Sequence, residues 1–411
     1  MTIDKIIFFH PSLITGGAEY LFLRCAECLA SYYPNYSIYI IEYKDGFARK
    51  NVKNKDINFI DYEEGKKIHI PDGAAIITQL DIIGVFQDLF EYNSQKSLFI
   101  YWCLHLLNLK NYYYGENFGY YLLKFEREFL GREIDWLAER DIVKFMGYGA
   151  NIRVMQDLCQ KPRQLRWLPN IIPINPSYKP SLERISFDEL KFCWLGRLDR
   201  EKARNVETYM NELESLFPQI RLSLSIIGLG PCEDYLKRIA NQYSYPISFV
   251  GEKRDEDLTS YITDHCDIGL ASGTSALELS MRGKPVILDG LLDRTYMAGE
   301  RKEYYLTSEK SSYSYDEKYS IIRDCTDYFK NKVDYIIENY ESVSRDCFTY
   351  VQRYSATNTC GEIVKCVEII SNYNTMDVLS HIKHANKILR CGMRRRNFIR
   401  KIRSYSVFPK K

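Results

Sequence analysis

Short apolar runs alternate almost throughout the chain with longer stretches whose apolar positions recur every three or four residues. The first apolar runs are rich in Ile, Tyr and Phe, as buried strands are, and cover residues 5–9, 36–43, 74–80 and 97–102. The stretch that begins near Gly17 has the spacing of an amphipathic helix. Strands that alternate with helices in this way predict a mostly parallel sheet covered by helices.

The pattern breaks at "RWLPNIIPINPSYKPS", where four prolines fall between Pro169 and Pro180 and disfavour regular structure. It then restarts, with strand-like runs at residues 190–196, 220–228, 246–251, 267–272 and 285–289. We therefore predict an α/β protein with two Rossmann-like, doubly wound domains joined by a linker near 170–180. Ligands of such sheets bind at the carboxyl ends of the strands, which predicts a main site in a cleft between the domains.

The predicted organisation has four parts. Residues 1–172 form an N-terminal domain and residues 173–345 a second domain. Residues 346–380 are helical and amphipathic, and we expect them to return toward the first domain. Residues 381–411 form a basic tail that also carries Ile, Leu, Phe and Tyr.

Composition places the chain among soluble globular proteins, because 45% of its 411 residues are hydrophobic and 27% are charged. No apolar run approaches the roughly 18 residues that span a bilayer, and the N-terminal run is too short for a signal peptide. We expect a cytoplasmic protein with reduced cysteines. Cys25 and Cys28 lie within a helical pattern with no second Cys or His pair, which favours packed thiols over a zinc or redox site.

The tail differs in charge from the rest of the chain. Residues 381–411 hold 11 Lys and Arg and no acidic residue, so the remainder is acidic overall. Such a segment can lie on an anionic membrane surface, which we favour over a terminus that pairs with the acidic body. Nucleic acid would use the same charges, but no other feature supports it.

The first candidate site follows the strand pattern at residues 190–196. Gly196 is followed by Arg197 and, five residues later, by Lys202. Two cations just past a strand end suit a phosphate-rich ligand, because Arg can bind two oxygens and Lys supplies a point charge. Asp199 and Glu201 offer the alternative that both cations are neutralised in a solvated loop.

Two more loops follow at the ends of later strands. Gly228 and Gly230 form a G-x-G between a strand and a helix, which fits either backbone approach to a ligand or a tight turn. Thr274 and Ser275 are expected to cap a helix whose free N–H groups favour a phosphate. Glu278, about one turn further on, is expected to accept the hydroxyls of a ribose.

These loops, in this order, resemble those of the GT-B glycosyltransferases, in particular the large retaining family 4 (group 1). The likeness rests on "GRLDREK", "IIGLGP", "FVG", "GTSALELSMRGKPVI", "LPNIIP" and the N-terminal "ITGGAEYLFLRCAECLA". It covers roughly residues 3 to 370, with loose individual motifs but a fairly specific order. It implies two Rossmann-like domains that face each other across a cleft.

The resemblance also implies roles for single residues. Arg197 and Lys202 would bind the diphosphate of a nucleotide-sugar and stabilise it as it leaves, so no general base is required. His105 would contact the transferred sugar or assist the reaction, with a half-buried structural histidine as the equal alternative. His10, which has a similar position after the first strand, is a weaker candidate.

Glu278 would hold the ribose of the donor. The other donor contacts that the resemblance implies are the glycines of three loops, a base-binding stretch and two hydroxyl residues: Gly16, Gly17, Gly196, Gly228, Gly230, Val250, Gly251, Thr274 and Ser275. Neither a metal nor another cofactor is expected. Asp255-Glu256-Asp257 is formally a D-x-D, but it reads better as the acidic first turn of a helix.

One position departs from the family pattern. Many relatives carry a second glutamate eight residues before the ribose-binding one, and here Leu270 takes that place. The donor sugar and the retention of stereochemistry therefore stay open.

We expect a transferase that uses a nucleotide-sugar donor and a glycan or lipid-linked acceptor, as in envelope or capsular polysaccharide biosynthesis. Two alternatives keep the fold: a nucleotide-sugar epimerase, and a non-catalytic transferase-like subunit.

Overall fold

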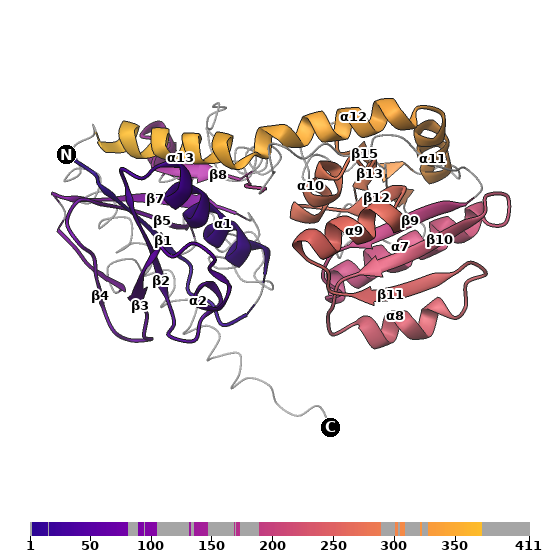
Figure 1. Cartoon of the computed structure of the whole chain (residues 1–411), viewed down its shortest axis with the longest axis horizontal. Coiled ribbons are helices and arrows are strands. Elements are labelled where there is room, and N and C mark those ends of the chain that lie inside the picture. Colours follow the sequence, from indigo (N-terminus) through magenta and orange to yellow (C-terminus); the bar gives the residue numbers. More distant parts are fainter. Residues whose placement is uncertain are drawn as a thin grey trace, which may run out of the picture. The chain divides into compact units, whose positions relative to one another are not determined.

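The computed structural model describes residues 2–14, 16–80, 89–93, 95–104, 131–132, 135–146, 168, 170–172, 189–288, 301–302, 305–308, 321–322 and 328–371. The chain divides into two compact units (Figure 1). Unit 1 comprises residues 1–171 and 356–411, and unit 2 comprises residues 172–355.

Unit 1 is built on a six-stranded parallel sheet in the order β3-β2-β1-β5-β7-β8. Its strands are β1 (Lys5–Phe9), β2 (Ser37–Glu42), β3 (Asn58–Asp61), β5 (Ala74–Gln79), β7 (Ser97–Cys103) and β8 (Val143–Phe145). Taken in chain order, these six strands lie 3-2-1-4-5-6, the order of dinucleotide-binding Rossmann folds. A small separate pair joins β4 (Ile68–His69) to β6 (Phe90–Glu91).

Two apolar faces of this sheet explain its unbroken hydrophobic strands. Successive side chains of a strand point to opposite faces, so Ile6 and Phe8 of β1 pack in one cluster and Ile7 and Phe9 in another. The first cluster includes apolar residues of α1 (Gly17–Tyr32), α2 (Phe47–Asn51) and α13 (Ala356–Ser371). A strand that is buried on both faces cannot alternate with polar residues, which is why the strands read as continuous apolar runs.

Unit 2 repeats the arrangement with the order β11-β10-β9-β12-β13-β15. Its strands are β9 (Leu190–Leu195), β10 (Leu222–Ile227), β11 (Ile247–Gly251), β12 (Ile268–Ala271), β13 (Val286–Leu288) and β15 (Tyr305–Leu306). The pairs are parallel except for β13 with β15, which is antiparallel. The short strands β14 (Arg301–Lys302) and β16 (Ile321–Ile322) form a separate antiparallel pair.

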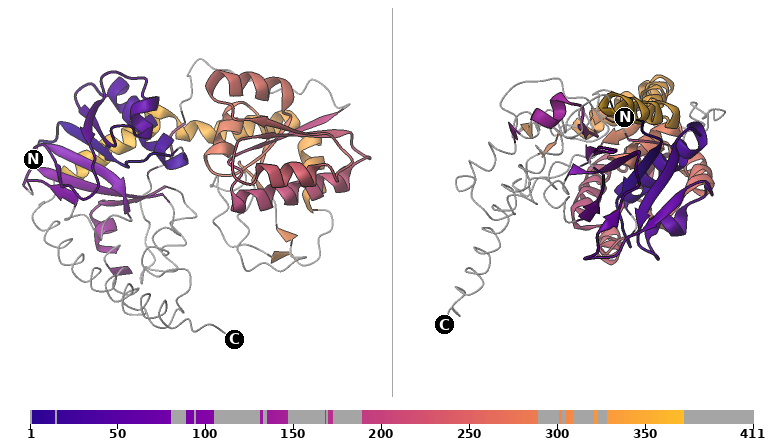
Figure 2. Two further views of the ribbon diagram at one scale, coloured as in Figure 1. Left: turned by 90° about the horizontal axis from the view of Figure 1, so that it is seen from below. Right: turned by 90° about the vertical axis from the view of Figure 1, so that its left-hand side faces the viewer.

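Helices cover both faces of this second sheet (Figure 2). They are α7 (Arg200–Leu216), α8 (Glu233–Ala240), α9 (Asp255–His265), α10 (Thr274–Met281), α11 (Tyr328–Glu338) and α12 (Tyr340–Val351). Phe192 and Trp194 of β9 pack with α7 and α11, whereas Cys193 packs with α9 and α10. A further small cluster packs α10 against α12 through Leu277, Met281 and Val351.

The helical C-terminal stretch is interrupted by a short 3-10 helix, η2 (Gln352–Tyr354). The division between the units falls after residue 355, so α12 belongs to unit 2 and α13 to unit 1. Residue 345, where the sequence placed the end of the second domain, lies inside α12. None of the helices described here is long and apolar enough to cross a membrane.

Candidate functional site

The carboxyl ends of β9, β10 and β11 carry three loops that are joined through their backbones. Leu198 N donates to Leu229 O at 3.0 Å, and Gly228 N donates to Gly251 O at 2.9 Å. Gly196 N also donates to Ile227 O at 3.1 Å. The loops that the sequence singled out after separate strands thus form one connected edge of the sheet.

Glycine is required where these loops meet. Gly228 has a φ of +142°, and a Cβ there would lie 2.0 Å from Gly196 O. A Cβ on Gly230 would lie 2.5 Å from the carbonyl of Leu198. The G-x-G therefore lets two loops pack backbone against backbone, which is a structural reason for both glycines besides their predicted role in donor binding.

The two predicted cations are held differently. Lys202 lies in the first turn of α7, and its Nζ donates a hydrogen bond to Ser272 Oγ in the loop between β12 and α10. Arg197 has a 68% exposed side chain whose Nη2 lies 3.5 Å from Asp199 Oδ2. Asp199 also caps α7, because its Oδ1 accepts from Lys202 N at 3.0 Å. Of the two neighbouring acids suggested as neutralising partners, Asp199 thus pairs with Arg197.

Helix α10 begins directly after this contact. Gly273 is its N-cap residue and no side chain caps it, so the expectation that Thr274 and Ser275 are caps is wrong. Both residues lie in the first helical turn instead, where backbone N–H groups have no acceptor within the helix.

The position of the missing glutamate lies in the strand before the loop that leads to α10. Leu270 lies within β12 and its fully buried side chain belongs to the apolar core of unit 2. The position eight residues before Glu278 therefore lies inside a strand rather than in a loop at the edge of the sheet. A glutamate placed at this position would be buried in the core.

Glu278 lies in the second turn of α10, as expected, and its side chain is 12% exposed. Its Oε2 is 2.8 Å from Nη1 of Arg282. This contact was not predicted from the sequence. The spacing of four residues between an acid and a base on one helix was the available signal. The acidic triplet at 255–257 does open α9, as predicted.

Val250 and Gly251 end β11, and Val250 packs against the apolar cluster beneath α9 and α10. No group of His, Cys, Asp or Glu within the described part of the chain could hold a metal ion. Cys25 is buried in the core of unit 1, and Cys28 packs at its margin.

In unit 1, the predicted Gly-Gly motif opens α1, with Gly16 as N-cap and Gly17 as the first helical residue. A Cβ on Gly17 would meet no atom within 4 Å, whereas one on Gly16 would lie 2.3 Å from Glu19 Oε2. The carboxylate of Glu19 therefore stands beside the N-cap of this helix. His105 lies outside the described residues.

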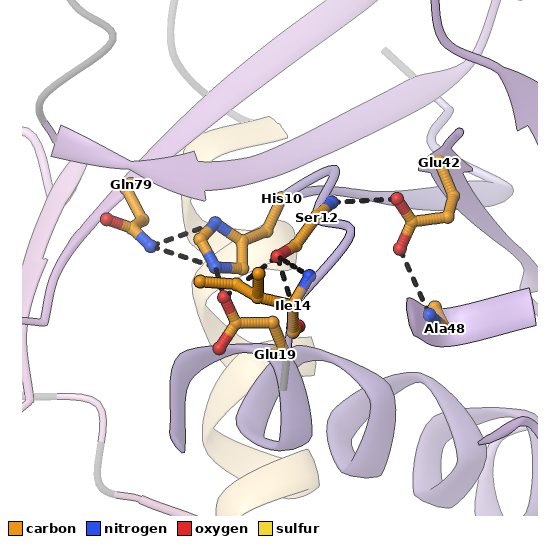
Figure 3. A network of polar contacts seen from close by, with 7 residues as sticks. All are labelled: His10, Ser12, Ile14, Glu19, Glu42, Ala48 and Gln79. Carbon is orange, nitrogen blue, oxygen red and sulfur yellow. Dashed lines mark hydrogen bonds and ion pairs between the residues drawn. The ribbon is translucent and has the colours of Figure 1, made fainter. Parts of the chain in front are cut away.

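A polar network surrounds the same helix end (Figure 3). Nε2 of Gln79 lies 2.9 Å from Nδ1 of His10, and Nε2 of His10 lies 3.4 Å from Oε1 of Glu19. Ser12 Oγ donates to the same carboxylate at 3.1 Å. Burial acts to raise the pKa of Glu19, but it is outweighed by the hydrogen bond from His10, a hydrogen bond to the backbone of Glu19 itself, the charge of His10 and the bond from Ser12. The pKa therefore lies below its usual value. His10 is thus fixed on both sides of its ring at the carboxyl end of β1.

Glu42 fixes the backbone of this network from the other side (Figure 3). It is 1% exposed and accepts from Ser12 N at 2.8 Å, Tyr43 N at 3.0 Å and Ala48 N at 3.0 Å. A buried carboxylate needs such donors to offset its desolvation. The loop after β1 is therefore anchored to α2 rather than held by α1 alone.

No protein-family model matches the sequence, and no curated protein matches it. Solved structures do match the fold. A glycosyltransferase from Rickettsia africae aligns with a TM-score of 0.58 and 12% identity over 91% of this chain and 100% of that chain. HepE of Anabaena, solved with UDP and glucose, aligns with a TM-score of 0.53 and 13% identity over 89% and 99%.

The lipopolysaccharide outer core galactosyltransferase WaaB, in its apo form, aligns with a TM-score of 0.54 and 12% identity over 88% of this chain and 99% of that chain. At such identities the likeness concerns the fold. The chain has the two Rossmann-type sheets of a GT-B protein, and the fold class predicted from the sequence is confirmed.

Proposed function

We propose that this protein transfers a sugar from a nucleotide-diphosphate-sugar to an acceptor hydroxyl. The observation that carries the proposal is the position of Lys202, whose ammonium is held at Ser272 directly before the N-terminus of α10. A fixed cation beside a helix N-terminus, at the carboxyl edge of a Rossmann-type sheet, suits a diphosphate. The glycosyltransferases among the solved structures of this fold support the same reaction class.

In the proposed reaction, the bond between the sugar C1 and the diphosphate oxygen breaks, and the acceptor oxygen bonds to C1. In the retaining form, the acceptor proton passes to the departing phosphate oxygen on the same face of the sugar. Lys202 and Arg197 stabilise the charge that develops on the diphosphate, which is the main catalytic contribution of the chain. Gly16 and Gly17, at the N-terminus of α1, remain predicted contacts of the donor.

We further propose a lipid-linked glycan acceptor, in envelope or capsular polysaccharide assembly. Leu13 and Ile14, beside the His10 network, are 58% and 69% exposed and offer apolar surface to such a molecule. The basic tail at 381–411 would keep the protein at an anionic membrane. WaaB, which acts on lipopolysaccharide outer core by its name, supports this class of acceptor.

The test is turnover of UDP- and GDP-sugars, starting with UDP-glucose because HepE was solved with UDP and glucose. Transfer to a glycan acceptor, or slow release of free sugar, supports the proposal, and its loss in Lys202→Met assigns the activity to this site. Isomerisation of the sugar would instead indicate an epimerase. Binding without turnover of any donor would indicate a non-catalytic subunit.

Metal is not needed in this scheme, because the side-chain cations supply the charge that a divalent ion supplies in other transferases. Turnover is therefore expected to persist after EDTA treatment and dialysis. Loss of activity that returns with Mg²⁺ or Mn²⁺ would contradict this part of the proposal.

A further inference from the structure

Arg282, the C-cap residue of α10, is a buried arginine with four hydrogen bonds. Its side chain is 4% exposed. Nη1 donates to Glu278 Oε2 and to Glu278 O, both at 2.8 Å. Nε donates to Thr259 Oγ1 at 3.0 Å, and Nη2 donates to Asp255 O at 3.3 Å.

These bonds join two helices of unit 2. Thr259 and Asp255 belong to the first turns of α9, which begins four residues after the end of β11 at Gly251. Asp255 has a φ of +46°, a conformation that costs free energy in a residue other than glycine. Its carbonyl accepts from both Arg282 and Thr259 Oγ1. Arg282 therefore holds the start of α9 as well as the carboxylate of Glu278.

We propose that Arg282 positions Glu278 for recognition of the donor ribose and links it to the loop before α9. This proposal rests on the proposed function and on the prediction from the sequence that Glu278 receives the ribose hydroxyls of the donor. A carboxylate has about four lone-pair sites, so it can accept hydrogen bonds from several donors at once. The guanidinium also fixes the side-chain rotamer, so less conformational freedom is lost when ribose binds.

If the ion pair of Arg282 and Glu278 were purely structural, removal of Arg282 would affect nucleotide binding differently. If Arg282 only joined α9 to α10, its removal would weaken binding of every nucleotide by the same factor. If it positions Glu278, its removal selectively weakens nucleotides that carry the hydroxyls. The ratio of affinities for a ribonucleotide and its 2′-deoxy counterpart separates the two roles, because base and diphosphate are the same in both ligands.

The experiment measures binding of UDP, GDP and ADP by calorimetry, then compares the tightest of them with its 2′-deoxy form. We expect the wild type to prefer the ribonucleotide by about tenfold or more, as for a hydrogen bond to a charged group. Arg282→Met is expected to lower that preference to about threefold or less. Arg282→Lys, which keeps a charge four residues from Glu278, is expected to retain an intermediate preference.

Two controls complete the design. Thr259→Val removes one bond of Arg282 but leaves its contact with Glu278, so it should keep the wild-type preference. Glu278→Gln should lose the preference for the ribonucleotide, as Arg282→Met does. If Arg282→Met does not fold, the preference of Arg282→Lys is compared with that of the wild type instead.

A wild-type preference that persists in both Arg282 variants would overturn this proposal and leave the proposed function intact. If Glu278→Gln also keeps the preference for the ribonucleotide, Glu278 does not recognise the ribose, and Arg282 then has no role in that recognition. A wild type that binds none of the three diphosphates would overturn the proposed function and this proposal together.

Discussion

Lys202 and Arg197 follow the same strand, yet their surroundings differ. The ammonium of Lys202 is restrained by a hydrogen bond to Ser272. In contrast, the side chain of Arg197 is 68% exposed and its Nη2 lies 3.5 Å from Asp199 Oδ2. A side chain that is already restrained loses less conformational freedom when a ligand binds. Lys202 should therefore contribute more than Arg197 to binding of a diphosphate.

Replacing Lys202 by Met is expected to weaken nucleoside diphosphate binding by about 10- to 100-fold, as for hydrogen bonds to charged groups. The same replacement of Arg197 is expected to weaken this binding by about three- to tenfold. Calorimetric titration measures both. Lys191→Met is the matched control, because Lys191 lies at the opposite end of β9 and donates to Asp264 O. Unchanged affinity in Lys202→Met would remove the site assignment.

Glu19 makes the stability of unit 1 depend on pH. Its pKa lies below its ordinary value of 4.5, so the folded protein binds this proton less readily than the unfolded chain does. The stabilisation is complete above about pH 4.5 and is lost as the pH falls through the lower pKa of the folded state. Glu19→Gln lacks this contribution and should be about 1 kcal/mol less stable at neutral pH.

Urea denaturation at a series of pH values tests this expectation, because the difference between wild type and Glu19→Gln should shrink as the pH falls below 4.5. The surface comparison is Glu63→Gln. Glu63 pairs with Lys66 at the surface, where solvent screens the charges, and its loss should change stability little. A constant difference between wild type and Glu19→Gln at every pH would contradict the assignment.

At the scale of elements, the loops after β9, β10 and β11 behave as one structure. Gly228→Ala would place a Cβ 2.0 Å from the carbonyl oxygen of Gly196, so the two loops must separate. We expect a loss of about 2–4 kcal/mol in the free energy of unfolding. Nucleotide binding should weaken as well, because Arg197 follows Gly196 directly.

Gly251→Ala is the control for backbone conformation alone. Gly251 has a φ of +76°, but a Cβ there would meet no atom within 4 Å. Its cost should stay near the roughly 1–2 kcal/mol of a left-handed residue. Equal destabilisation of the two variants in denaturant titrations would show that the close approach of the loops is unimportant.

At the scale of the whole molecule, both units use the strand order 3-2-1-4-5-6 with helices packed on the sheet. This repetition gives the chain the two Rossmann-type sheets of a GT-B protein. The segment 381–411 follows the last described helix, α13, in the sequence. The 11 basic residues of that segment are accompanied by no acidic residue. Each contributes roughly 1 kcal/mol when it lies near an anionic membrane.

Deletion of residues 381–411 is therefore expected to abolish sedimentation of the protein with vesicles that contain an anionic lipid. Vesicles of neutral phosphatidylcholine should bind neither form, since the attraction is electrostatic. Turnover of a soluble donor should persist in the truncated protein. Retention of the truncated protein on anionic vesicles would exclude the tail as the membrane contact.

The strand pattern, the break at the prolines and the order of the loops were readable from the sequence, because a strand buried on two faces must be apolar along its whole length. The start of α1 at the Gly-Gly motif and the position of Glu278 one turn into a helix followed from local signals. The cap of α10 was misassigned because Thr274 and Ser275 are good capping residues, whereas the helix already begins at Thr274 and its N-cap is Gly273.

Only the tertiary structure decided which distant side chains meet. The bond between Lys202 and Ser272 spans 70 positions, and the one between Ser12 and Glu42 spans 30. No periodicity relates such pairs, because they depend on which strands lie side by side in the sheet. The apolar pattern thus determined the two sheets and the edge where we predict that the ligand binds. Packing of the loops determined which charged side chains lie at that edge and which partners hold them.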